Sequence, residues 1–215
     1  LYALLNLSSR TLEVTLSETI DVYNGATNLI DLSKIFLSNV VGDLLIGVAG
    51  AVTPVEDTPV LVLALTREQS AFANTKSGVA GGDGQAMSLD VQANAFQDLV
   101  GLKNLLFTNV TVNEYPDLIP PTVLNVTVDY SKGGTGCGFT RCGSVYIEFS
   151  EFIREESIYI NTSKVTLAND HNDTVIRLDE AILNSAVGYE MRFTLNEVQR
   201  AVAITQSGTR GGDGI

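Results

Sequence analysis

The stretch ALTREQSAFANTKSG at residues 64–78 has a counterpart, TLNEVQRAVAITQSG, at residues 194–208. The third residue of each stretch, a threonine or an asparagine, is followed three positions later by a glutamine. This spacing is typical of a capping box, in which the two side chains bond each other's backbone N–H groups at the start of a helix. We therefore expect short helices over residues 67–75 and 197–205, each ended by the Ser-Gly pair.

The two stretches belong to a longer repeat, because residues 30–84 align with residues 160–214 at a constant offset of 130 and without a gap. About 19 of the 55 aligned positions are identical, which indicates an internal duplication. Upstream, LEVTLSETID from Leu12 faces VYIEFSEFIR from Val145, three positions out of that register. The chain therefore consists of two copies of one domain in series.

The junction between the copies is the stretch EYPDLIPP at residues 114–121. Its three prolines favour an extended, semi-rigid connection. LLNLSS near Leu4 resembles VLNVTV near Val123, so the second copy begins soon after the junction. We therefore divide the chain into a first domain, residues 1–117, and a second domain, residues 118–215.

Short apolar runs separated by glycine, asparagine and aspartate indicate an all-β chain. The segments LEVTL and VYIEF alternate with a period of two, and we expect each strand to end at the Ser-Glu pair that follows. About seven short strands per roughly 100 residues are typical of a sandwich of two sheets. The expected strands are residues 12–16, 33–39, 59–65, 86–91 and 105–112 in the first copy and residues 145–149, 163–169 and 189–195 in the second.

Four segments carry a resemblance to a known family: VYIEFSEFI, SKVTL and FTLNEVQRAV in the second copy, and SLDVQANAFQDLVGLKN at residues 88–104 in the first. They resemble the immunoglobulin-like domains that form long arrays in surface-layer and adhesive-fibre proteins. Similar arrays occur in protist flagellar-hair (mastigoneme) and other extracellular filament glycoproteins. The last segment resembles the closing strand and Asp-x-x-Gly-Asn turn of that family, with Leu102 and Lys103 inserted before Asn104.

The resemblance covers most of the chain. It implies two tandem immunoglobulin-like β-sandwiches, each with one short helix. Its motifs are patterns of strands and turns, which specify a fold better than they specify a function.

The formal net charge of the chain is −12, and no basic cluster is present. An acidic chain repels phosphate backbones and anionic membranes, so we expect no nucleic-acid partner. The longest apolar run, residues 44–52, is too short to span a bilayer, so we expect no membrane insertion. The start at Leu1, without a methionine or a basic leader, favours a mature or incompletely observed chain over a signal peptide.

Five asparagines lie in N-x-S/T sequons, the acceptor sequence for N-linked glycans. Asn109 and Asn125 fall in β-rich segments, where an outward side chain can carry a sugar. The alternative is that asparagine stands next to threonine by chance in a chain rich in strands. The sequons are at Asn6, Asn109, Asn125, Asn161 and Asn172.

Cys137 and Cys142 are the two cysteines of the chain, and glycines flank both. A disulfide between them would staple the loop between the first two strands of the second copy, with a stabilisation of roughly 2 kcal/mol. A metal site would need further cysteine or histidine ligands, and the chain has one histidine. We favour the disulfide, and with it an oxidising compartment, over two free thiols.

The motif GGDG occurs at residues 81–84 and again at residues 211–214. A calcium loop of the repeat-in-toxin type needs an aspartate two residues after the motif, and Ala86 occupies that position in the first copy. A phosphate-binding loop would need a Lys-Ser/Thr pair after the glycines, and none follows. We expect a tight turn with glycines at positive φ, and Asp83 and Asp213 remain weak candidates for metal ligands.

The residue patterns typical of catalysis are absent from the sequence. His171 stands in the polar stretch NDHNDT beside a sequon, which indicates a solvent-exposed loop residue. Glu18 and Glu151 occupy equivalent positions in the two copies, so they need not share one cleft as a pair for glycoside cleavage. We expect neither an enzyme nor a cofactor.

These features predict a structural subunit of a secreted or cell-surface glycosylated filament. The second copy ends before any equivalent of residues 86–112, so its sandwich would have an unpaired edge. We expect a neighbouring subunit to fill that edge by strand addition, with residues 1–9 as the donor unless they form the first strand of their own domain. Such head-to-tail contacts produce helical filaments.

Two other functions stay open. The chain could be a fragment of a longer cell-surface array, with the missing strands elsewhere in the polypeptide. It could also be a carbohydrate-binding module, although such a module needs an exposed aromatic platform and the chain has no tryptophan.

Overall fold

The chain divides into two compact units, Leu1–Ile119 (unit 1) and Pro120–Ile215 (unit 2). Strands dominate the described part of both units, and one α-helix lies in each, as an all-β chain with short helices requires. The structure is a computed structural model. It describes residues 1–40, 45–130, 143–153, 160–168 and 175–208, apart from the side chains of residues 184–187.

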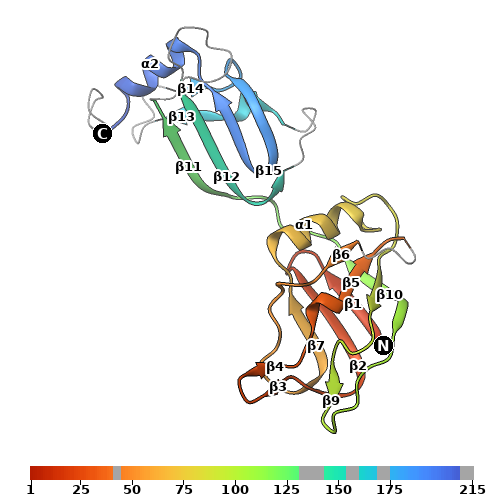
Figure 1. Cartoon of the computed structure of the whole chain (residues 1–215). Helices are drawn as coiled ribbons and strands as arrows, with labels where there is room; N and C mark the ends of the chain where they lie inside the picture. Colours follow the sequence, from red (N-terminus) through yellow and green to blue (C-terminus); the bar gives the residue numbers. More distant parts are fainter. Residues whose placement is uncertain (41–44, 131–142, 154–159, 169–174, 209–215) are drawn as a thin grey trace. The chain divides into compact units, whose positions relative to one another are not determined.

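Unit 1 contains one curled sheet and a two-stranded ribbon (Figure 1). Its strands are β1 (Tyr2–Asn6), β2 (Thr11–Asp21), β3 (Tyr23–Asn24), β4 (Thr27–Asn28), β5 (Ile35–Ser38), β6 (Ile46–Gly47), β7 (Thr58–Ala64), β8 (Ser88–Val91), β9 (Gln97–Asp98) and β10 (Phe107–Tyr115). Its helices are the 3₁₀ helix η1 (Leu32–Lys34) and the α-helix α1 (Arg67–Lys76). The sheet has the order β6-β5-β8-β10-β1-β2-β7, with β9 also paired to β2, and the ribbon joins β3 to β4.

Strand β10 connects the two halves of this sheet. It begins antiparallel to β8, with Phe107 opposite Val91, and ends parallel to β1, with Val112 opposite Ala3. The register of β10 against β8 shifts between Phe107 and Val110, where Asn109 takes a positive φ of 56°. The strand therefore belongs to both halves, and the sheet curls around an apolar core.

Alternating side chains place one face of the longer strands in that core. In β2, Leu12 and Val14 are buried, whereas Glu13 and Thr15 are only half-buried. Strand β8 differs, because every residue in it is buried. It lies between β5 and β10 inside the sheet, so both of its edges are covered.

Unit 2 contains a three-stranded and a two-stranded sheet. Its elements are β11 (Val123–Asp129), β12 (Ser144–Ile153), η3 (Thr162–Lys164), β13 (Thr166–Ala168), β14 (Val175–Arg177), β15 (Ile182–Thr194) and α2 (Glu197–Thr205). The larger sheet has the order β11-β12-β15, and the smaller one pairs β13 with β14.

The two units repeat the same local structure at the offset of the sequence repeat. In unit 1, Leu12 of β2 lies opposite Leu63 of β7, and in unit 2, Val145 of β12 lies opposite Phe193 of β15. Helix α1 contacts β6, and α2 contacts β14, the equivalent of β6. Strands β11, β12, β13, β14 and β15 therefore correspond to β1, β2, β5, β6 and β7 (Figure 1).

Both predicted helices are confirmed, with α2 ending at the predicted residue and α1 one residue later. In each helix the capping residue accepts from the N–H of the glutamine, and the glutamine side chain accepts from the capping residue's N–H. No helix in the described ranges is long and apolar enough to cross a membrane.

Two kinds of predicted strand boundary are wrong, each in both units. The Ser-Glu pairs do not end the strands that begin near Leu12 and Val145, because β2 continues to Asp21 and β12 continues to Ile153. The Ser-Lys pairs belong to η1 and η3 instead of opening the next strands. In these turns Asp31 and Asn161 accept from the backbone two residues later, which closes a 3₁₀ turn before the strand begins.

The junction between the units is shorter than its sequence indicates. Strand β10 extends to Tyr115, so the first part of the predicted junction is strand. After β10, the N–H of Leu118 donates to Ser8 Oγ at 2.8 Å, which ties the chain to unit 1. The N–H of Thr122 donates to Ser150 Oγ at 2.9 Å, which ties it to unit 2.

Candidate functional site

The main structural difference between the units lies along one edge of β13 and one edge of β11. In unit 1, β5 lies between β6 and β8, and β1 lies between β2 and β10. In unit 2, β13 pairs with β14 and β11 pairs with β12, and neither has a second partner strand among the described residues. The described residues of unit 2 therefore contain no strand at the positions that β8 and β10 occupy in unit 1, and we call these two positions the open edges of β13 and β11.

The open edge changes the burial of equivalent residues in β5 and β13. Leu37 and Ser38 are each 0 % exposed in unit 1, where β8 pairs with them. Their equivalents in unit 2 are Leu167, which is half-buried, and Ala168, which is exposed. The apolar side chain of β13 therefore lacks the cover that its twin has.

Strand β11 shows the same difference, and it also corrects the sequence alignment. Leu5 lies opposite Leu12, and Val128 lies opposite Val145, so Val128 takes the place of Leu5. The similarity of LLNLSS to VLNVTV had matched Leu5 with Leu124, four residues too early. Leu5 is completely buried, whereas Val128 is half-buried.

A cavity of about 110 Å³ opens between these strands and α2. This volume is several times the roughly 10–15 Å³ that one water molecule needs. The Tyr130 hydroxyl donates to the carbonyl of Ala203 at 3.4 Å at one side of it. The lining residues are Val128, Tyr130, Leu167, Ala168, Ile176, Ala203 and Gln206.

The backbone of β13 offers hydrogen-bonding groups beside the cavity. The carbonyl of Val165 accepts from the N–H of Leu178 at 3.0 Å, on the β14 side of the strand. Hydrogen-bonded residues alternate along an antiparallel pair, so Leu167 also faces β14, and Thr166 and Ala168 direct their N–H and C=O groups toward the open edge. This geometry allows a further strand to pair with β13.

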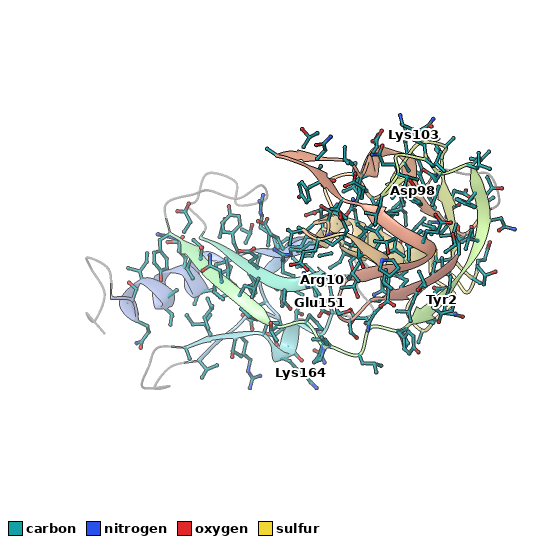
Figure 2. The ribbon with its side chains drawn as sticks, turned by 90° about the horizontal axis from the view of Figure 1, so that it is seen from below. Tyr2, Arg10, Asp98, Lys103, Glu151 and Lys164 are labelled. Carbon is teal, nitrogen blue, oxygen red and sulfur yellow. The ribbon has the colours of Figure 1, made fainter. Side chains whose placement is uncertain are left out.

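Charged groups lie outside the lining of the cavity. At the start of α2, Arg200 Nη2 is 2.7 Å from Glu197 Oε1, and this hydrogen bond lowers the pKa of Glu197 and raises that of Arg200. Lys164, just before β13, projects from the surface of unit 2 (Figure 2). The site thus combines apolar side chains with backbone donors and acceptors, which suits an extended peptide better than it suits proton transfer.

Three of the sequon asparagines are exposed. Asn125 lies on β11, on the face opposite to Val128 and the cavity, because side chains alternate along a strand. Asn109 lies at the register shift of β10, and its N–H donates to Asp90 at 2.6 Å. Asn161 caps η3 through its Oδ1.

The other two sequons differ from these. Asn6 is half-buried at the end of β1, and its Oδ1 accepts from the N–H of Ser9 at 3.1 Å. Asn172 lies outside the described residues.

The segment that resembles a family turn forms a closed set of backbone bonds. Asp98 Oδ1 accepts from the N–H groups of Val100 and Leu102, and Gly101 takes a φ of 86°. Asn104 Oδ1 accepts from the N–H groups of the two residues at positions 95 and 96, and its Nδ2 donates to two carbonyls. Figure 2 places Asp98 and Lys103 at the same end of unit 1. The side chains of Asp98 and Asn104 are both used to hold the turn.

The first GGDG motif forms the expected turn, with Gly81 and Gly84 at φ values of 102° and 86°. Asp83 Oδ2 accepts from Asn39 Nδ2 at 2.7 Å, and Lys76 Nζ lies 3.8 Å from it. The described residues contain no cluster of acidic, histidine or cysteine side chains that could hold a metal ion. Asp213 and the second motif lie outside the described residues.

The remaining candidate residues lie in different units or outside the described residues. Glu18 belongs to β2 of unit 1. Glu151, labelled in Figure 2, belongs to β12 of unit 2. His171, Cys137 and Cys142 lie outside the described residues.

Residues 1–9, the expected strand donor, are part of unit 1 in this structure. Strand β1 pairs with both β2 and β10, and Ala3, Leu5 and Leu7 are almost completely buried. The sequence predicts two roles for this segment, and in the structure it forms the first strand of its own domain. A strand that fills the edge of unit 2 therefore has to come from another segment.

The sequence predicts an unpaired edge in the second copy but does not place it on β13. The missed residues are Thr166, Leu167 and Ala168, and the available signal was their alignment with Phe36, Leu37 and Ser38. The order of strands in unit 1 was needed to show what covers those three residues. No protein-family model, curated protein or solved structure matches this chain.

Proposed function

We propose that this chain is a structural subunit of an extracellular, glycosylated filament, in which neighbouring chains associate by strand addition at unit 2. The observation that carries the proposal is the pair of open edges on β11 and β13, beside an apolar cavity. An exposed edge of this kind pairs with another strand unless something protects it. The lining of the site offers apolar side chains that an extended peptide can contact, which supports a structural role.

The same proposal includes immunoglobulin-like sandwiches as the building blocks. In such a fold the first, second and fifth strands share one sheet, and the third, sixth and seventh share the other. Unit 1 has β1, β2 and β7 side by side, and β5, β8 and β10 side by side, which supports this assignment. Unit 2 repeats the part of this arrangement that its described strands cover.

Head-to-tail assembly needs two different surfaces on each chain. Unit 2 supplies the open edges, and unit 1 has an exposed apolar loop between β9 and β10. Leu102, Leu105 and Leu106 in this loop are 69 %, 76 % and 61 % exposed. Exposed apolar patches of this kind are typical of protein interaction sites, so unit 1 has a second surface for contact with a neighbour.

An extracellular location is proposed from the sequons. Asn109, Asn125 and Asn161 are all exposed, so each can carry a glycan without disturbing the core. The glycan at Asn125 would lie on the face of β11 away from the cavity, where it leaves the open edge accessible.

Electron microscopy of the chain secreted from eukaryotic cells tests the proposal. We expect fibres with a regular repeat, and we expect their number to increase with protein concentration. A chain that stays monomeric at high concentration and refolds reversibly in dilute solution would rule the filament out.

The open edges also fit a chain that belongs to a longer surface array, in which the same polypeptide supplies the additional strands. The intact mass of the native protein separates the two cases. A mass well above that of 215 glycosylated residues favours the array, and a matching mass favours the filament.

A further inference from the structure

We propose that the open edge of β13 accepts one strand of defined pattern from a neighbouring chain. That strand runs antiparallel to β13 and carries apolar side chains at three alternating positions, as Met87, Leu89 and Val91 do in unit 1. The middle apolar side chain enters the cavity beside Leu167. This inference deepens the proposed function and rests on it, because it names the partner segment that strand addition requires.

Strand β8 shows which strand the equivalent edge of unit 1 holds. It runs antiparallel to β5, with Leu89 opposite Leu37 and Ser88 opposite Ser38. The side chain of Leu89 is completely buried, and those of Met87 and Val91 are each 1 % exposed. Burial of these alternating side chains in the core holds β8 in place, in addition to its backbone bonds.

Because β13 is the equivalent of β5, we expect an added strand to pair with β13 in the same register. The residue equivalent to Leu89 lies opposite Leu167, and the residue equivalent to Ser88 lies opposite Ala168. In unit 1 the N–H of Gln92 also donates to the Lys34 carbonyl at 2.8 Å. The equivalent acceptor in unit 2 is the carbonyl of Lys164.

The cavity decides which side chains are selected. The position opposite Leu167 faces a mostly apolar lining with Ile176 and Ala203, so a charged side chain there would lose hydration without gaining an oppositely charged partner in the lining. The position opposite Thr166 is less restricted. Its occupant in unit 1, Asp90, accepts from the N–H of Asn109 in β10, a contact that matters only when a second strand follows.

A short peptide copied from unit 1 tests the inference on the full chain. The peptide is AMSLDVQA, residues 86–93, with both ends blocked, and its binding is followed by fluorescence anisotropy of an attached dye. We expect saturable binding, and we expect amide hydrogen exchange to slow at Thr166 and Ala168 while the amide of Leu167, which faces β14, changes little. In the peptide, Leu89→Asp should weaken binding about tenfold or more, because it places a charge in the cavity.

A matched pair of chain variants tests the same edge from the other side. Thr166→Pro removes an N–H that points to the open edge, and Val165 before it has φ −99° and ψ 120°, a conformation that a following proline accepts. We expect this variant to bind the peptide about tenfold more weakly or worse, since it loses a main-chain bond and gains a ring at the edge. Thr166→Val keeps the N–H and should bind like the unmodified chain.

The outcomes separate this inference from the filament proposal. Binding of the peptide with no fibres under any condition supports the strand site and rules out the filament. Fibres that form in the presence of excess peptide, with no slowed exchange in β13, overturn the strand site and leave the filament standing.

Three further results would overturn the strand site itself. The first is equal binding by the parent and Leu89→Asp peptides, a test that holds even if Thr166→Pro fails to fold. The second is exchange at Thr166 and Ala168 that is already slow before peptide is added, which would mean that residues of the same polypeptide occupy the edge. The third is a symmetric dimer through β13 that the peptide cannot displace.

Discussion

Asp31 and Asn161 cap the same turn in the two units with different chemistry. Each accepts from the backbone N–H of a serine two residues later, at 3.2 Å. Only Asp31 is charged, and the Nζ of Lys34 lies 3.0 Å from its Oδ2. Hydrogen bonds from Ser33, and then from Lys34, lower the pKa of Asp31. The turn needs the acceptor oxygen, and the charge adds a contribution that depends on pH.

The substitution Asp31→Asn separates these two effects. The lowered pKa means that the carboxylate stabilises unit 1 above its ordinary pKa, and that this contribution is lost as the pH falls through the lowered value. Because the Asp31 side chain is 43 % exposed, solvent screens its charge, and we expect the variant to lose less than about 1 kcal/mol at neutral pH. Urea unfolding at neutral and at acid pH measures the loss, which should vanish at acid pH. Glu56→Gln is an exposed control. A loss of equal size at both pH values would contradict the role of the charge.

At the scale of elements, one glutamine in each unit attaches the helix to the strands. Gln69 is buried, its Oε1 accepts from the N–H of Thr66, and its Nε2 donates to the carbonyls of Gly47 and Ala49 at 2.9 and 2.8 Å. Gln199 makes the same capping bond in unit 2. The capping glutamine therefore fixes the position of the helix as well as its first turn.

Replacement of this glutamine by alanine leaves buried backbone groups without a partner. We expect Gln69→Ala to destabilise unit 1 by about 1–3 kcal/mol, although alanine is a better helix former. Glu68→Ala, on the exposed side of the same turn, should change stability by less than about 0.5 kcal/mol. Thermal or urea unfolding of the two variants checks both values. Equal effects of the two substitutions would show that the hydrogen bonds from Gln69 to the carbonyls of Gly47 and Ala49 contribute little to the stability of unit 1.

The elements that could be predicted from the sequence are those held by local bonds. The capping boxes and the turn at residues 81–84 join groups only a few positions apart, so their signals are complete within a short stretch. The register of β11 could not be predicted in this way. Leu124, Val126 and Val128 present the same alternation, and only the pairing with β12 shows that Val128 takes the place of Leu5.

The sequence predicts an unpaired strand edge in the second copy, but it does not show which strand carries that edge. The reason is again that strand pairing joins segments far apart in the chain. Sequence alignment indicates that Leu167 is the twin of Leu37, but it does not show that Leu37 lies under β8. The position of β8 between β5 and β10 depends on contacts between segments far apart in the chain. The order of the strands in the sheet of unit 1 was therefore needed to identify β13 as a strand with an open edge.

At the scale of the whole molecule, the two units differ in how much of their core is enclosed. The strands β8 and β10 cover the core of unit 1, while the described residues of unit 2 leave Val126 46 % exposed and Leu167 half-buried. Apolar surface stabilises a fold by about 25 cal/mol for each Å² that is removed from water. Unit 2 alone should therefore be the less stable unit, and a strand at β13 should stabilise unit 2 and leave unit 1 unchanged.

Urea unfolding of the full chain, followed by amide exchange in each unit, tests this difference. We expect two transitions, with protection lost first in β12 and β15 and later in β1, β2 and β7. Leu63→Ala, in the core of unit 1, should lower the free energy of unfolding only in the later transition, by about 2–5 kcal/mol. Phe193→Ala, at the equivalent position of unit 2, should lower it only in the earlier transition, by about 3–5 kcal/mol. The peptide AMSLDVQA should shift the earlier transition to higher urea concentration as the peptide concentration increases, and it should leave the later transition unchanged. One shared transition, or a shift of the unit 1 transition by the peptide, would show that the open edge of unit 2 does not limit its stability.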